Sequence, residues 1–406
     1  MKIRTITCFY DPQIHDPRVV ARLEEVALAA ENQFTVAGYP VQTRRLSTTP
    51  FANYIGGKDQ GMAVEMVQQM EMSAGKHGFA YISIGPASVD AHGSFAAIAP
   101  ILSATRNVFA SAHLTTPQKG VSLAAVRACA EIIHQAAHIT ADGFTNLRFA
   151  ALANVRPQGP FFPGSYNQAG RMGFALGIEC ADAAVEAFTR AGSLPEARAG
   201  LIERLEGAAS ELTRTATHIA AQYAVDFFGF DFSLAPFPED WCSLGRAIEC
   251  LGIPQVGMHG SLAGAAIIAD TLDRGRWQRA GFNGLFLPIL EDSVLARRSH
   301  ITLTVKDLLL YSAVCGAGLD TVPLPGDTPA EHIAALLVDV AALALRLDKP
   351  LSARLMPVPA KRAGELTSFD FSFFANGRIL ALDARTLTHW LAGEEALEIS
   401  PRPLSL

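Results

Sequence analysis

The sequence is poor in charge: Asp, Glu, Lys and Arg make up only 18% of its 406 residues, and its formal net charge is −6. It has no cluster of lysine and arginine that would attract a phosphate backbone. Nucleic acid is therefore excluded as an expected partner. The sequence also lacks an uninterrupted apolar run of the roughly 20 residues that a membrane-spanning helix needs, so we expect no membrane partner.

Signals of export and of cysteine-based metal sites are absent as well. The six cysteines form no C-x-x-C pair and show no zinc-ribbon spacing, which favours free thiols in a reducing compartment. Residues 1–8 look like a strand and lack the apolar core and the small-residue cleavage site of a secretory signal. We therefore expect a cytoplasmic protein.

The common catalytic motifs are missing. There is no G-x-G-x-x-G after an expected strand, no Walker A motif and no G-x-S-x-G elbow. A nicotinamide cofactor, a P-loop nucleotide site and an esterase triad are therefore not expected. His134 and His138 have the spacing of a zinc pair, but Gln135 stands where a metalloprotease has its glutamate. A histidine pair on a helix surface is the better interpretation.

What the sequence does have is 50% hydrophobic residues, arranged as short apolar strands that alternate with helices. This alternation predicts an α/β fold with a mostly parallel sheet, either a closed barrel or a doubly wound layer, of roughly ten strands. No linker interrupts the pattern, so we expect residues 1–406 to form a single domain. The expected strands are residues 3–9, 41–47, 80–84, 108–112, 149–153, 173–178, 230–234, 255–258, 285–290 and 319–322, with further candidates near 354 and 371. The expected helices include residues 17–30, 62–72, 122–138, 181–191, 243–251, 261–272 and 329–345.

The stretch 311–331 carries the densest local signals. Thr304 can cap an apolar helix at 308–314, and Gly316 is placed to end it. A strand at 319–322 then carries Asp320, and the T-P-A-E at 328–331 reads as a capping box that starts the next helix. The loop between them contains Asp327 and lies beyond the carboxyl end of a strand, where α/β proteins bind ligands. Asp320 and Asp327 are therefore candidate substrate-binding residues.

Polar residues follow many of the expected strands at the point where each strand ends. In a parallel sheet these carboxyl ends meet at one edge, so the side chains would converge although they are distant in sequence. This convergence is the main reason to expect an enzyme, and it makes Asn154 a candidate substrate contact. The residues are His113, Asn154, Glu179, His259, Glu291 and Asp292.

Asp231 lies within an otherwise hydrophobic strand and shares one face of it with Ser233. A buried carboxylate requires a partner, because isolation would cost several kcal/mol. In a functional site the partner is a metal ion or solvent, and in a structural role it is an arginine or a neighbouring turn. We interpret Asp231 as a candidate catalytic residue or metal ligand, and Ser233 as a candidate substrate contact.

His259, Gly260 and Ser261 lie between an expected strand and a helix that Ser261 can cap. Free backbone N–H groups at such a helix start, beside a glycine that permits close approach, can bind a carboxylate or a phosphate. His259 is then a candidate general base, metal ligand or anion contact, with a structural histidine as the alternative. Gly260 and Ser261 are candidate substrate contacts.

Glu291 and Asp292 precede another expected helix and are the candidate metal ligands. Asp231, His259, Glu291 and Asp320 at one mouth would offer oxygen and imidazole ligands to a divalent cation, although no local spacing motif marks a metal site. The alternative is that the helix dipole alone favours acidic residues at 291 and 292.

Arg44 and Arg45 fall on one expected strand, so they point to opposite faces and only one of them can face a site. Arg45 is the candidate carboxylate clamp. Cys315 is a candidate catalytic residue, although its place at a helix end disfavours the thiolate and a packing role is the alternative. The loop at 156–171, rich in proline and glycine, is expected to close over the substrate.

Several of these segments together resemble the family called domain of unknown function 711, in the same order along most of the chain. The resemblance implies the pyruvate formate-lyase-like fold of glycyl-radical enzymes, which is a ten-stranded α/β barrel and would account for the many strands. The chain lacks the C-terminal R-V-x-G motif of the radical loop; the most similar segment is R-I-L-A at 378–381, which has no glycine. No glycyl radical is therefore expected. The segments are T-R-R-L-S-T-T-P (43–50), D-F-S-L-A-P (231–236), V-G-M-H-G-S (256–261), L-F-L-P-I-L-E-D (285–292) and C-G-A-G-L-D-T-V-P-L-P-G-D-T-P-A-E (315–331). The resemblance also implies one neighbourhood for Asp231, His259, Glu291, Asp292, Cys315, Asp320 and Asp327.

The leading hypothesis is a cytosolic enzyme that acts on a small anionic metabolite by non-radical acid/base chemistry, with His259 as base and Asp231 as its orienter. The alternative is a barrel that binds or senses a small molecule without catalysis. A divalent metal ion and a homo-oligomeric assembly both stay open, because the sequence fixes neither.

Overall fold

The computed structural model describes residues 1–402 apart from 15, 17, 56–57, 92 and 117–119. Nine of its strands form one sheet in the order β10-β11-β7-β4-β3-β2-β1-β8-β9. Their bounds are β1 (Lys2–Tyr10), β2 (Arg44–Thr48), β3 (Tyr81–Ala87), β4 (Val108–His113), β7 (Phe149–Ala153), β8 (Gly173–Glu179), β9 (Asp226–Ala235), β10 (Gly318–Pro325) and β11 (Leu351–Val358). Most strands therefore lie where the apolar runs predict them. A second, three-stranded sheet consists of β5 (Thr115–Thr116), β6 (Gly120–Ser122) and β12 (Ala396–Leu397).

The direction of the strands divides the large sheet into parts. The five strands β1, β2, β3, β4 and β7 are parallel to one another. The pairs β8–β9 and β10–β11 are each parallel internally, but they join the central five antiparallel, at β1–β8 and at β7–β11. The expectation of a mostly parallel α/β sheet is confirmed. The expectation that all carboxyl ends gather at one edge is wrong, because an antiparallel joint sends the ends of neighbouring strands to opposite edges.

A closed barrel of ten strands is not detected among the described residues. The run expected as a strand at 285–290 is irregular, yet the segment 278–290 makes backbone contacts with both outer strands of the sheet. It bridges Arg279 to Phe230 of β9 and Pro288 to Asp320 of β10. The large mixed α/β sheet is thus shown, whereas the ten-stranded barrel of the pyruvate formate-lyase-like fold is not confirmed.

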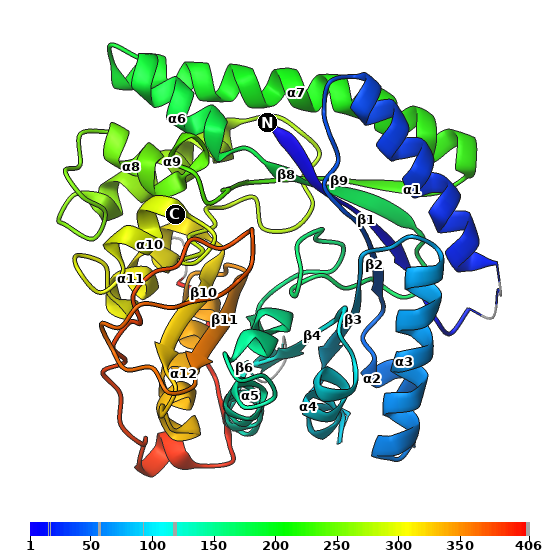
Figure 1. The fold of residues 1–406 in the computed structure, drawn as a ribbon, viewed down its shortest axis with the longest axis vertical. Coiled ribbons are helices and arrows are strands. Elements are labelled where there is room, and N and C mark those ends of the chain that lie inside the picture. The colour runs from blue at the N-terminus through cyan, green and yellow to red at the C-terminus, as the bar shows by residue number, and fades with distance from the viewer. Residues whose placement is uncertain (15, 17, 56–57, 92, 117–119, 403–406) are drawn as a thin grey trace.

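The helices lie on the outside of the strands (Figure 1). The 30-residue helix α7, which the sequence analysis did not place, packs against α1 and α6. Its buried side chains recur at helical spacing, for example Leu201, Leu205 and Leu212, so a signal for it is present. The bounds are α1 (Val19–Val36), α2 (Ala52–Ile55), α3 (Gln60–Lys76), α4 (Ser94–Ala104), α5 (Leu123–Ala137), α6 (Ala181–Arg190), α7 (Leu194–Tyr223), α8 (Leu244–Cys250), α9 (Ser261–Arg274), α10 (Ser293–Arg298), α11 (Val305–Cys315) and α12 (Ala330–Arg346), with 3-10 turns η1 (Phe144–Arg148), η2 (Asp240–Cys242) and η3 (His389–Ala392).

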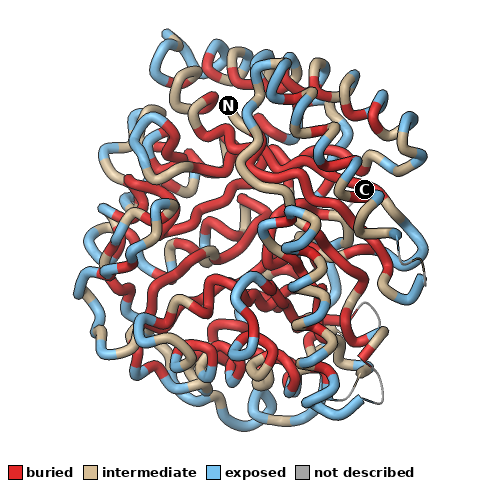
Figure 2. The backbone as a smooth tube through the Cα atoms, turned by 45° about the vertical axis from the view of Figure 1, so that its right-hand side comes forward, coloured by how far each residue is buried: buried red, intermediate tan, exposed pale blue. Residues whose placement is uncertain are grey.

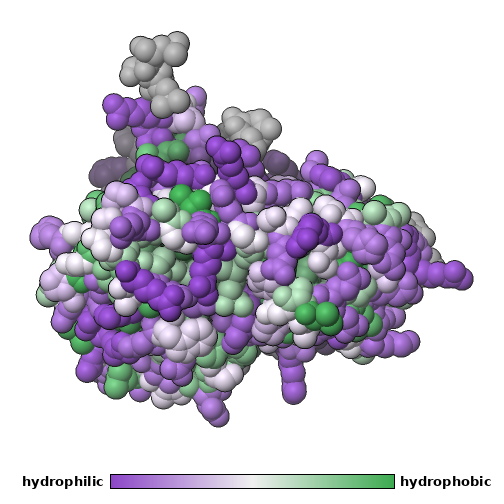
Figure 3. All heavy atoms as spheres, turned by 90° about the horizontal axis from the view of Figure 1, so that it is seen from above, coloured by the Kyte–Doolittle hydropathy of each residue, from purple (hydrophilic) through white to green (hydrophobic). Residues whose placement is uncertain are grey.

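Burial follows this layering. The strands form a continuous buried interior, and the exposed backbone lies in the outer helices and loops (Figure 2). The face seen in Figure 3 is mostly hydrophilic, with small separate apolar areas. None of the described helices combines the length and the apolar character that are required to cross a bilayer.

The loop that joins β7 to β8 lies inside this interior. Residues 159–165 are all buried, and Pro160 O accepts a hydrogen bond from Thr7 in β1. The ring of Phe161 packs edge-on against Phe286, with 5.0 Å between ring centroids. The interpretation of residues 156–171 as a lid is therefore wrong for the central part of the loop. Its apolar residues are held in place because the strands enclose them.

Local signals in the stretch 304–331 have a mixed outcome. The cap of α11 is confirmed: Thr304 and Asp307 form a reciprocal capping box, and Gly316 ends the helix with a left-handed φ of 72°. The capping box expected at 328–331 is wrong, because the Thr328 hydroxyl donates to Pro325 O and α12 begins after Pro329. Residues 255–258 form turns instead of a strand, and the segment near 371 is irregular.

Candidate functional site

Asp231, which the sequence suggested as a catalytic residue or metal ligand, has several hydrogen-bond partners within the protein. It is fully buried in β9, and its carboxylate accepts hydrogen bonds from the amides of Phe282 (2.7 Å) and Asn283 (3.1 Å). The amide and hydroxyl of Ser233 also donate to it. Burial raises the pKa of Asp231 to about 6, although these hydrogen bonds oppose the shift. Asp231 and Ser233 together hold the turn at 281–284, because Ser233 Oγ also accepts from the Gly284 amide.

His259 lies elsewhere. It is exposed, just before α9, and makes no hydrogen bond or ion pair with the part of the chain that the structure describes. Gly260 is the N-cap of α9 in a left-handed conformation (φ 104°), and the buried Ser261 hydroxyl accepts from the Gly257 amide. The structure therefore does not bring His259 and Asp231 together.

The remaining candidates are dispersed. Asp292 is the N-cap of α10 and accepts from the Ser243 hydroxyl and from four backbone amides, which opposes the pKa increase caused by its burial. Cys315 is buried at the end of α11. Asn154 donates to Asp348 from the carboxyl end of β7, and Asp327 is exposed in its loop. The neighbourhood implied by the resemblance is therefore not assembled as a whole.

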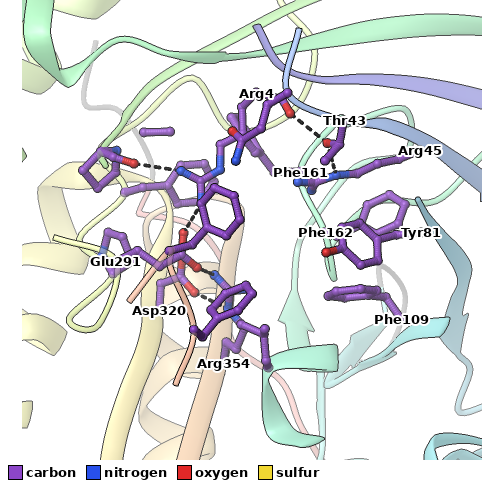
Figure 4. A pocket seen from close by; sticks show the side chains of 18 residues that line it. Arg4, Thr43, Arg45, Tyr81, Phe109, Phe161, Phe162, Glu291, Asp320 and Arg354 are labelled. Carbon is purple, nitrogen blue, oxygen red and sulfur yellow. Dashed lines mark hydrogen bonds and ion pairs between the residues drawn. The ribbon is translucent and has the colours of Figure 1, made fainter. Parts of the chain in front are cut away.

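A different group does come together, around a cavity in the interior (Figure 4). It includes Arg45, Glu291 and Asp320 from the predicted set and adds Arg4 of β1 and Arg354 of β11. The cavity has a volume of about 90 Å³, which is enough for a few water molecules or a compact ligand. Aromatic rings form much of the wall: Tyr81, Phe109, Phe161, Phe162, Phe286, Phe371 and Phe373.

An ion-pair network forms one side of this cavity. Arg354 donates through Nη2 to Glu291 Oε1 at 2.8 Å and through Nε to Asp320 Oδ1 at 2.5 Å. The other oxygen of Glu291 accepts from Arg4 Nη2, and Arg4 Nη1 donates to Pro236 O at 2.8 Å. Burial alone would raise the pKa of Glu291, but Arg4, Arg354 and Arg45 lower it below its usual value. Burial raises the pKa of Asp320, with Arg354 opposing.

Arg45 forms the opposite side and has no carboxylate partner. Its Nε donates to Thr43 Oγ1 at 2.9 Å, and its guanidinium carbon lies 5.6 Å from the ring centroid of Tyr81 and 5.3 Å from that of Phe162. No ion pair forms between Arg45 and any residue that the structure describes. Burial, with the nearby charges of Arg4 and Arg354, lowers the pKa of Arg45 to about 9, so the group stays protonated at neutral pH.

Comparison with known proteins gives a clear relationship. Residues 1–373 match the family model described as Uncharacterised ACR (DUF711). The chain belongs to this family. It is 31% identical to the UPF0210 protein of Pyrobaculum arsenaticum, over 88% of this chain and 81% of the relative. It is 30% identical to the UPF0210 protein of Desulforudis audaxviator (87% and 81% covered) and 26% identical to that of Methanocaldococcus jannaschii (87% and 82% covered).

The family match includes every residue that lines the cavity, from Arg4 to Phe373. In this DUF711 member the cavity lies at the amino ends of β1 to β4 and at the carboxyl end of β9, where Ala235 lines it. The rule that ligands bind beyond the carboxyl ends of strands thus holds for only part of the sheet. The antiparallel joints are the reason, because they place both kinds of strand end around one cavity.

Arg4 and Arg354 were not among the predicted site residues, although the sequence carries a signal for both. Each is a charged residue inside an apolar strand, in I-R-T-I and in A-R-L-M, and each is buried. Like Asp231, each of them is a charged residue that requires a partner when it is buried. Pairing these strand-interior charges with one another would have indicated the network.

The donor set for a metal ion does not assemble as predicted. No group of three or more His, Cys, Asp or Glu side chains in the described part of the chain is arranged to hold one. Both oxygens of Glu291 accept from arginines, and Asp292 is occupied by hydrogen bonds at a helix start. The two candidate metal ligands are therefore engaged with different parts of the protein.

Proposed function

We propose that this DUF711 protein binds a small organic anion in the cavity and acts on it by acid/base chemistry. The observation that carries the proposal is the guanidinium of Arg45, which lines the cavity without an ion pair among the described residues. Arg45 is half-buried, and its desolvation, which lowers its pKa, is not offset by an ion pair; a bound anion would offset it. A planar guanidinium is suited to a carboxylate or phosphate because it can donate two parallel hydrogen bonds.

The charges that line the cavity support an anion. Among the three arginines of the lining, Arg4 pairs with Glu291 and, at 3.5 Å, with the buried Glu179, and Arg354 pairs with Glu291 and Asp320. Arg45 alone has no ion pair among the described residues, and a bound anion would provide its partner. The aromatic wall supplies apolar surface for the rest of the ligand, and the small volume favours a compact molecule.

Asp320 is the candidate group for proton transfer. Burial raises its pKa, which makes it a better proton acceptor than an ordinary aspartate, and only its Oδ1 is engaged, with Arg354. Glu291 has a different role, because its two oxygens hold Arg4 and Arg354 in place. In the proposed mechanism Arg45 orients the anion, Arg354 positions Asp320, and Asp320 exchanges a proton with the ligand.

Binding of short-chain carboxylates by isothermal titration calorimetry tests the proposal. Arg45→Met is expected to lose binding by at least tenfold, because it removes a charge-assisted contact. Arg44→Met is the matched control: Arg44 is the neighbouring residue, it faces away from the cavity and it pairs with Glu31 at 3.0 Å. Arg44→Met and the exposed His259→Ala should bind like the wild type. Equal affinities for Arg44→Met and Arg45→Met would remove the assignment of the site.

A further inference from the structure

We infer that the ligand carries a second polar group, a hydroxyl or amino donor, which the free oxygen of Asp320 accepts. The ligand class is then a compact hydroxy- or amino-carboxylate with an apolar side chain. This inference rests on the proposed anion site at Arg45 and adds a second contact to it.

One carboxylate oxygen of Asp320 is a hydrogen-bond acceptor that has no donor among the described residues. Asp320 Oδ1 accepts from Arg354 Nε, whereas Oδ2 takes part in no hydrogen bond with the described residues. The side chain is 12% exposed and lines the cavity. The donor that Oδ2 accepts from therefore has to come from the cavity, where a polar group of a ligand can take the place of water.

The neighbouring carboxylate shows that the free oxygen is specific to Asp320. Glu291 lies in the same network, but its Oε1 accepts from Arg354 and its Oε2 from Arg4. Of the two carboxylates that line the cavity, Asp320 alone therefore has an oxygen available to a ligand. On the side of the cavity formed by the ion-pair network, Asp320 Oδ2 is therefore the carboxylate oxygen that can accept from a donor group of the ligand.

The two unpartnered groups lie on opposite sides of the cavity. Figure 4 shows Arg45 beside Tyr81 and Phe162 on one side, and Asp320 with Glu291 and Arg354 on the other. A ligand whose anionic end contacts Arg45 can therefore present a donor to Asp320 across the cavity. A cavity volume of about 90 Å³ suits a compact ligand, such as a 2-hydroxy or 2-amino acid, that carries the two groups on neighbouring carbons.

Such a contact would select among anions. A hydrogen bond to a charged group changes affinity by roughly tenfold to a hundredfold, and a site built for it discriminates against the analogue that lacks the donor. Arg45 would then supply affinity for any small carboxylate, and Asp320 would act as the specificity-determining residue.

The test uses three acids with one carbon skeleton: 3-methylbutanoate, 2-hydroxy-3-methylbutanoate and valine. Their affinities are measured by calorimetry on the full chain and on Asp320→Asn, which preserves the side-chain shape and the acceptor for Arg354 but replaces Oδ2 by a donor. In the wild type at least one of the two donor-bearing acids is expected to bind tenfold or more tightly than 3-methylbutanoate. In Asp320→Asn this difference should disappear while 3-methylbutanoate still binds.

The outcomes separate the two proposals. If all three acids bind the wild type equally, the inference about Asp320 is overturned and the anion site stands. If none of them binds, the anion site is overturned as well for small carboxylates. If Asp320→Asn does not fold, the wild-type series still decides the matter, because it compares ligands on one protein. A preference that persists in a folded Asp320→Asn would also overturn the inference.

Discussion

Arg44 and Arg45 are neighbours in β2, yet their guanidinium groups have opposite surroundings. Arg44 Nε lies 3.0 Å from Glu31 Oε2 on α1, whereas Arg45 faces the cavity and has no ion pair with the described residues. The alternation of a strand places them on different faces, as the sequence predicts. Two arginines on one strand thus provide an internal comparison between an arginine with an ion-pair partner and one without.

This comparison predicts opposite effects on stability. Arg45→Met is expected to raise the free energy of unfolding of the ligand-free protein by about 1 kcal/mol, because a half-buried charge without an ion-pair partner is removed. The lost contacts with Thr43, Tyr81 and Phe162 keep the gain small. Arg44→Met is expected to lower the free energy of unfolding by up to about 1 kcal/mol, the usual range for a partly exposed ion pair. Urea denaturation measures both. A clear loss of stability in Arg45→Met would show that Arg45 has a structural role.

Glu291 is expected to be the most sensitive position in the network. Glu291→Gln removes the carboxylate that Arg4 and Arg354 share, although Arg4 keeps Glu179 and Arg354 keeps Asp320. Because neither guanidinium loses its last counter-ion, the expected cost is about 3 kcal/mol, the lower end of the range for a broken buried pair. The matched control is Asp240→Asn, whose ion pair with Arg297 is half exposed and should be worth about 1 kcal/mol or less. The measurement is equilibrium unfolding in urea. Similar losses in the two variants would contradict the assignment of Glu291 as the centre of the network.

These predictions depend on residues that local patterns indicated only in part. The strands are recognisable because short apolar runs alternate with amphipathic helices, and 149–153 coincides with β7. The direction of β8 and β11 has no local signal, since it depends on pairing with strands far away in sequence. The direction of these strands decides which strand ends face the same cavity. Because it could not be predicted, the predicted site was in the wrong place.

The individual site residues show the same limit. Asp231 and Arg45 are both polar residues inside apolar strands, but Asp231 holds a turn and Arg45 faces a cavity. What separates them is the presence of backbone donors from 282 and 283, a segment about fifty residues away. Periodicity gives the face of a side chain, whereas its partners are fixed by the tertiary fold.

Asp231 is expected to destabilise the folded protein as the pH rises, whereas a carboxyl group with a lowered pKa does the opposite. Its pKa is raised from 3.8 to about 6 in the folded protein, chiefly by burial, so the folded state binds a proton more readily than the unfolded chain. Its contribution to stability is fully present below about pH 4 and is lost as the pH rises through about 6. The full effect is about 3 kcal/mol, from 1.36 kcal/mol per pKa unit.

The difference in free energy of unfolding between wild type and Asp231→Asn isolates this contribution. Asparagine cannot titrate, and it is less stable overall because its amide faces the donors of Phe282 and Asn283. The wild type should gain relative to Asp231→Asn as the pH is lowered from 7 to 4. A difference that stays constant over this range would show that the carboxyl group does not have a raised pKa.

Gly177 tests whether the inner loop forms a fixed wall of the cavity. A Cβ at this position in β8 would lie 2.9 Å from Thr5 Cγ2 and 3.0 Å from the ring of Phe161, which lines the cavity. Gly177→Ala is therefore expected to lower the free energy of unfolding by about 1–3 kcal/mol, the cost of overpacking a buried site, and to weaken ligand binding by displacing the ring.

The control is Gly207→Ala in α7, where nothing lies within 4 Å of the new Cβ. Alanine there should stabilise the helix by about 0.5–1 kcal/mol and leave binding unchanged. If Gly177→Ala is as stable as the wild type, the loop shifts to accommodate the methyl group, and Phe161 does not form a fixed wall of the cavity.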